Sequence, residues 1–159
     1  MKNEGGIAMA FNLGKMAGNA ILNGLSGNLN EVSPQALQSE YGAYLMDGET
    51  IQTGFKLVRD AVVITDKRIL DFDRQGATGS KQRVKSIRLS SIIEVEAETA
   101  GFGLDDSELN ITYIASPYYK ANGVVLEKRK FEFPKKYNVQ GLYKMLVEIA
   151  EANVDALNR

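Results

Sequence analysis

Residues 49–73, ETIQTGFKLVRDAVVITDKRILDFD, decide the class of fold. Over this stretch apolar and polar residues alternate with a period of two, which is typical of β-strands that bury one face. β-Branched residues are concentrated in VVIT at residues 62–65, and Asp66 then supplies a turn before the pattern resumes. The predicted strands occupy residues 49–58, 60–65 and 67–73.

The two-residue period continues downstream as far as Phe133. No segment of about 10–15 residues with helical spacing interrupts it, so consecutive strands are expected to pair antiparallel. Short strands separated by turns that contain Gly, Ser, Asp or Pro favour a sandwich or barrel of two sheets. The four further strands are predicted at residues 82–89, 92–100, 107–115 and 124–133.

A helix is predicted on each side of the strands. The first, at residues 34–46, begins at Ser33-Pro34, because Ser caps free backbone amides and Pro suits the first helical position. The second, at residues 138–156, carries an apolar stripe at steps of three and four residues, so it is expected to cover an open corner of the β-structure. The stripe consists of Val139, Leu142, Leu146, Ile149, Ala150 and Val154.

This order of elements and several local pieces resemble one family. The most specific piece is LVRD at residues 57–60, followed by a β-rich run and TDKR at residues 65–68. Further pieces are GLSGNLNEVSPQALQSEY (24–41), LMDGETIQTGFKLVRDAVVITDKRIL (45–70), QGATGSKQ (75–82), SIRLSSI (86–92) and ETAG (98–101). Over residues 24–146 the chain resembles the bacterial pleckstrin-homology (PH) domain family of small, uncharacterised prokaryotic PH-like proteins.

The resemblance implies a mainly β fold, a PH-like barrel of two antiparallel sheets with seven strands, capped by a C-terminal α-helix. It also implies homo-oligomeric, often ring-like assembly, and it implies no known ligand. Residues 1–30 look like an apolar, Gly-rich N-terminal extension with helical character, and residues 31–159 like the PH-like domain. Residues 116–130 form a longer link between the last two strands than is usual in the family.

Histidine and cysteine are both absent from the chain. Their absence removes the commonest general base at neutral pH, the thiolate nucleophile and the commonest metal ligands. We therefore expect no enzymatic activity, no cofactor, and no catalytic or metal-binding residues. Because no apolar run is long enough for a secretory signal or a membrane span, a cytoplasmic location is expected.

Charge is unevenly distributed, although the net charge is only −1, which argues against general affinity for nucleic acid. Residues 56–88 hold nine bases and four acids, residues 91–112 six acids and no base, and residues 120–136 six bases and two acids. Aromatic rings beside bases suit a protein interface, an anionic lipid surface or single-stranded nucleic acid, whereas the simpler explanation is a solvated loop. The candidate interaction surface consists of Tyr118, Tyr119, Lys120, Lys128, Arg129 and Lys130.

Three weaker candidates are set aside. The link at residues 56–60, where eukaryotic PH domains bind inositol phosphates, offers few donors and an adjacent carboxylate, so a tight β-turn is expected. Residues 76–81 lack the glycine spacing and following helix of a phosphate loop and are expected to form a hairpin loop. Asp105, Asp106 and Glu108 lack the ligand spacing of an EF-hand.

The charges on either side of Ser90-Ser91 leave two alternatives open. If this dipeptide closes a two-residue hairpin, Lys85 faces Glu96 and Arg83 faces Glu98. If the two strands belong to different sheets, as in PH folds, the charges are free to point at a neighbouring subunit.

Residues 7–25 carry many large apolar side chains and a single charge, Lys15. An apolar strip left over from a complete domain often marks an interface. A flexible tail, a cover for the chain's own barrel and a membrane contact are the alternatives. The candidate oligomer contacts are Ile7, Phe11, Met16, Ile21, Leu22 and Leu25.

The sequence thus favours a non-enzymatic PH-like interaction module, a homo-oligomeric scaffold or adaptor that binds itself and an unidentified protein. The alternative is a peripheral membrane module that binds an anionic lipid surface through basic residues and the N-terminal apolar segment. No nucleic acid is expected as a partner.

Overall fold

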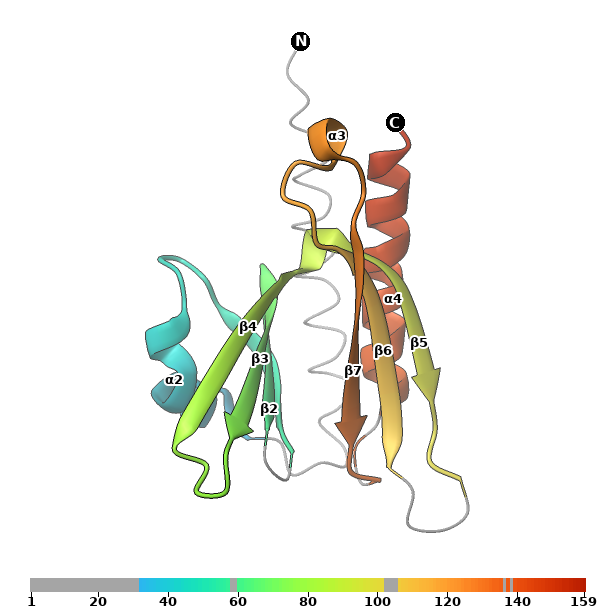
Figure 1. The fold of residues 1–159 in the computed structure, drawn as a ribbon. Helices are drawn as coiled ribbons and strands as arrows, with labels where there is room; N and C mark the ends of the chain where they lie inside the picture. The colour runs from blue at the N-terminus through green and yellow to red at the C-terminus, as the bar shows by residue number, and fades with distance from the viewer. Residues whose placement is uncertain (1–31, 58–59, 102–105, 136, 138) are drawn as a thin grey trace.

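The computed structural model describes residues 32–57, 60–101, 106–135, 137 and 139–159, and within these ranges the chain forms two antiparallel sheets and a long C-terminal helix. One sheet has the strand order β1-β2-β3-β4 and the other β5-β6-β7 (Figure 1). The strands are β1 (Ile51–Lys56), β2 (Ala61–Thr65), β3 (Arg68–Gln75), β4 (Lys81–Arg88), β5 (Ile92–Glu98), β6 (Ser107–Ile114) and β7 (Leu126–Phe133). The helices are α2 (Pro34–Tyr41), the short α3 (Tyr119–Asn122) and α4 (Val139–Leu157). The predicted fold class is confirmed.

The observed element bounds differ from the predicted ones mainly at turns. The first helix was predicted to reach residue 46, but α2 ends at Tyr41 and a 3₁₀ turn, Gly42–Tyr44, follows it. The third strand is longer than predicted, because Gln75 pairs with Lys81 across the β3–β4 hairpin. The loop of that hairpin has glycines at the two positions with positive φ, Gly76 (85°) and Gly79 (62°), a backbone region that side chains disfavour.

The chain passes from one sheet to the other at the 3₁₀ turn Leu89–Ser91. Consequently β4 and β5 do not pair, and the alternative in which Lys85 faces Glu96 and Arg83 faces Glu98 is wrong. The physical reason is the burial of Leu89, which drives the turn into the core and splays the two strands apart.

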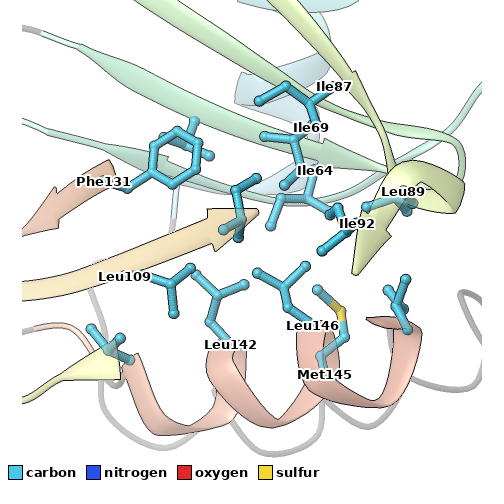
Figure 2. Close-up of a cluster of buried hydrophobic side chains, with 14 of the residues drawn as sticks. Ile64, Ile69, Ile87, Leu89, Ile92, Leu109, Phe131, Leu142, Met145 and Leu146 are labelled. Carbon is cyan, nitrogen blue, oxygen red and sulfur yellow. The ribbon is translucent and has the colours of Figure 1, made fainter. Parts of the chain in front are cut away.

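The main core fills the space between the two sheets and α4. Each sheet contributes the side chains of alternate residues, such as Ile64 and Ile69 from one sheet and Leu109 from the other. Figure 2 shows Leu142 and Leu146 of α4 directed at these residues, and both are almost fully buried. The apolar stripe predicted for the C-terminal helix therefore closes the barrel.

A polar side chain anchors α4 at the corner between the sheets. Asn153 is buried, and its side-chain amide donates hydrogen bonds to the backbone oxygens of Leu89 and Ile92, both at 2.7 Å. Leu89 is the first residue of the 3₁₀ turn, and Ile92, which follows the turn, begins β5. One side chain thus fixes the register of α4 against the point where the chain changes sheets.

Helix α2 covers the opposite, outer face of the four-stranded sheet. Its Leu37 and Tyr41 pack there on a second apolar cluster that includes Val63 and Phe72. Gly54 permits this contact, because a Cβ at that position would lie 2.8 Å from Cδ1 of Leu37. Strand β2 is consequently buried on both faces.

We expect Leu146→Ala and Ile149→Ala each to lower the free energy of unfolding by about 2–5 kcal/mol, because both side chains are buried against the sheets and truncation leaves a cavity. Urea melts measure the loss. Lys144→Ala, on the exposed face of the same helix, is the matched control. Losses below about 1 kcal/mol at both apolar positions would contradict the packing described here.

Candidate interaction surface

Two buried or half-buried charges connect the sheets on their inner faces. Asp71 of β3 is fully buried, and Arg129 of β7 reaches it from the other sheet. Nε of Arg129 lies 2.7 Å from Oδ2 of Asp71, and Nη2 donates to Oδ1 at 3.2 Å. Because a buried charge is costly without its partner, this pair holds Arg129 in the barrel rather than on an external surface.

A second group of inner-face charges lies beside this pair. Lys85 of β4 donates to a carboxylate oxygen of Glu127 at 2.7 Å, and the Tyr113 hydroxyl donates to the same oxygen. The Glu127 carboxylate and then the Tyr113 hydroxyl raise the pKa of Lys85. Arg83 lies 3.4 Å from Asp73, its neighbour across β3 and β4. These bases have partners within the chain.

The outer face of the three-stranded sheet is exposed and carries charges in rows. On β5 the outward residues Glu94, Glu96 and Glu98 are all acidic and exposed. On β7 the outward bases are Lys128 and Lys130. The acids thus line the edge of this sheet that β5 forms, opposite the edge that β7 forms.

The structure divides the six residues of the candidate interaction surface among three places. Lys128 is exposed on the outer sheet face, Lys130 pairs there with Glu108 and Glu132 at 3.0 Å each, and Arg129 points inward. The other residues lie beyond the sheet at the β6–β7 hairpin tip, where Tyr118 and Lys120 are exposed. Tyr119 begins α3 there, and its side chain lies outside the described atoms.

The hairpin tip also exposes apolar residues that the sequence pattern predicts to lie in a strand. Val124, Val125 and Leu126 are between 51% and 58% exposed, and Tyr118 is 72% exposed. A signal was present in the sequence, since three successive apolar residues after Gly123 break the alternation of a half-buried strand.

The predicted tight turn between β1 and β2 falls partly on residues outside the described ranges. The Leu57 N–H donates to the Asp60 backbone oxygen at 2.9 Å, while residues 58 and 59 lie outside the described residues. Lys56 is paired with Glu40 of α2. A shallow cleft of about 190 Å³ opens beside this pair, and its lining mixes acids and bases.

The acid with the most favourable surroundings is Glu49, which precedes β1. Arg68 holds it with two hydrogen bonds of 2.9 Å, and Thr65 and the Met46 N–H donate at 2.7 and 2.8 Å. Burial opposes ionisation, but these donors, Arg68 first, outweigh it and lower the pKa of Glu49 to about 2. All of its partners are structural, so this group fastens the loop after α2 to β2 and β3.

Within the described ranges, no three acidic side chains gather in a way that could hold a metal ion. Asp105, one of the three acids weighed above as a calcium site, lies outside those ranges. Among the same residues, no helix is long and apolar enough to cross a membrane.

Comparisons with known proteins agree with this architecture. Residues 20–150 match the family model described as "Bacterial PH domain". The chain belongs to the bacterial PH domain family. This bacterial PH domain is 37% identical over 128 residues to the uncharacterized protein YjqA of Bacillus subtilis, an alignment that covers 80% of the chain and 96% of YjqA. The family resemblance noted from the sequence is confirmed.

Solved structures show the same fold. The PH domain of Shewanella amazonensis superposes with a TM-score of 0.58 at 32% identity, covering 82% of this bacterial PH domain and 98% of that chain. A DUF1696 family protein from Shewanella loihica gives the same TM-score at 29% identity, covering 78% and 98%. The names of these relatives state a fold and no ligand.

We expect Glu49→Gln to destabilise the protein near neutral pH by roughly 3 kcal/mol, because the ordinary pKa near 4.5 falls to about 2 on folding. A lowered folded pKa stabilises the native state above the unfolded pKa, and this contribution disappears as pH falls from about 5 towards 2. The difference in unfolding free energy between wild type and variant should therefore shrink over that range. Glu148→Gln, on exposed helix surface, is the control, and a difference that stays constant with pH would contradict the assignment.

Soluble inositol phosphates are expected not to bind the Lys56–Asp60 link with micromolar affinity or better. Lys56 is already paired with Glu40, and a cradle for several phosphates needs several free donors. Calorimetric titration of the full chain tests this. Tight binding that disappears in Lys56→Ala or Arg59→Ala would overturn the prediction.

Proposed function

We propose that this bacterial PH domain is a homo-oligomeric, non-enzymatic scaffold or adaptor that binds protein. The observation that carries the proposal is the opposite charge of two consecutive strands, each at an edge of its own sheet. Strand β4, KQRVKSIR, has four bases and no acid, whereas β5, IIEVEAE, has three acids and no base.

These two strands do not neutralise one another within a subunit. They belong to different sheets, and Glu96 and Glu98 are exposed with no partner in the described part of the chain. At the ends of β4, Lys81 and Arg88 are exposed in the same way. A head-to-tail contact, in which one surface meets a different surface of the next copy, would place β4 of one subunit near β5 of its neighbour.

The N-terminal segment supports the same proposal from the sequence side. Residues 7–25 lie outside the described residues, and within the described part of the chain the sheets and α4 share a continuous apolar core. Apolar side chains of this number favour burial, at roughly 25 cal/mol per Å² of apolar surface. A neighbouring subunit is the partner that the oligomeric family resemblance suggests for them.

Light scattering on the full-length protein is the direct test, and we expect a mass above that of one chain at micromolar concentration. Glu96→Lys with Glu98→Lys should weaken assembly, and adding Lys81→Glu with Arg88→Glu should restore it, because the charges are then exchanged. Lys144→Glu, a base-to-acid change on exposed α4, is the matched control and should leave the mass unchanged.

Two results would contradict parts of this proposal. A monomeric mass for the full-length chain would end the oligomer idea altogether. A protein that begins at Asn28 and keeps the full mass would remove only the role of residues 7–25.

A further inference from the structure

The β6–β7 hairpin extends beyond the two sheets as a separate projection. In Figure 1 its tip, with α3, stands at one end of the molecule. The Ala115 N–H donates to the Val125 backbone oxygen at 2.8 Å, and the Val125 N–H donates to Oγ of Ser116 at 3.2 Å. The two arms are therefore held together after the regular pairing of β6 with β7 has ended.

Both sides of this projection are exposed. Successive residues of an extended chain point to opposite sides, yet Val124, Val125 and Leu126 are each more than half exposed. Tyr118 adds the most exposed of the large apolar side chains in the described part of the chain. A flat protein surface would cover one side of such a projection, whereas a bilayer surrounds whatever enters it.

The charge of the tip matches an anionic surface. Between residues 115 and 126 the only charged side chain is Lys120, which is exposed. The next base, Lys128, is also exposed, and the carboxylate between them, Glu127, already accepts from Lys85 and Tyr113. Aliphatic and tyrosine side chains beside lysines are the composition that favours the headgroup region of an anionic membrane.

We propose that the β6–β7 hairpin tip inserts into the interfacial layer of an anionic lipid bilayer, with Val124, Val125 and Leu126 at the acyl boundary and Lys120 and Lys128 at the headgroups. This contact goes beyond the proposed assembly and does not depend on it. The names of the relatives give no role to the residues of this hairpin tip.

The absence of tryptophan from the chain makes a direct test possible. Val125→Trp places a single tryptophan at the tip, and Met46→Trp places one at another exposed apolar position, 48% exposed, in the loop after α2. On vesicles of equal parts phosphatidylcholine and phosphatidylserine, the emission of the full-length Val125→Trp protein should shift to the blue and be quenched by brominated lipid. The emission of Met46→Trp should not change.

Sedimentation with the same vesicles separates the contribution of the apolar side chains from that of the lysines. Val124→Asn with Leu126→Asn should abolish binding, and Lys120→Gln should weaken it about fivefold, as expected for one lysine near an anionic surface. Circular dichroism verifies that each variant is folded. Emission that shifts equally at positions 46 and 125, or at neither, overturns the proposal.

Two further results would also overturn it. Equal binding to vesicles of phosphatidylcholine alone would mean that the tip does not recognise the negative charge of the bilayer. A Val125→Trp emission already blue-shifted without vesicles, and red-shifted in a protein that begins at Asn28 or on dilution, would mean that residues 7–25 or a second copy cover the tip.

Discussion

The corner where the chain leaves one sheet and enters the other is the point on which the barrel depends. Two sheets that each bury one face need a fixed angle between them, and here that angle is set by three residues, Leu89–Ser91. Two interactions hold the turn. Leu89 is buried in the apolar core, and the side-chain amide of Asn153 donates two hydrogen bonds to backbone oxygens at the turn. With α4 fixed there, its stripe covers both sheets, and the core closes.

Charges in this protein fall into two populations. Those on the inner faces are paired across strands or sheets, as Asp71 with Arg129 and Lys85 with Glu127, and they contribute to how the sheets fit together. Glu96 and Glu98 of β5 and the bases at the ends of β4 are exposed with no partner within the described residues, and they are the ones available to another molecule. Counting bases along the sequence does not separate the populations, because neighbours such as Lys128 and Arg129 point to opposite sides of one strand.

Much of the fold was predictable from the sequence, since the change from a two-residue period to helical spacing marks where sheets end and α4 begins. The start of α2 was predictable because Ser33 caps the helix, its oxygen accepting from the Ala36 N–H. The candidate interaction surface was less predictable from the sequence. Whether Arg129 faces in or out depends on Asp71, which lies 58 residues away in the chain and in the other sheet. The exposure of Val124 and Val125 was missed because β-branched residues favour a strand, although the break in alternation after Gly123 argued against a strand with one buried face.

The placement of α2 has a consequence for how the molecule opens. Its cluster on the outside of the four-stranded sheet is separate from the core between the sheets. Strands β2 and β3 are buried on both faces and contribute side chains to both clusters. Helix α2 can therefore detach and exchange its amide hydrogens while the barrel remains closed. The amides of β2 and β3, by contrast, are protected until both layers separate, which makes these two strands the slowest to exchange and the boundary between two cooperative units.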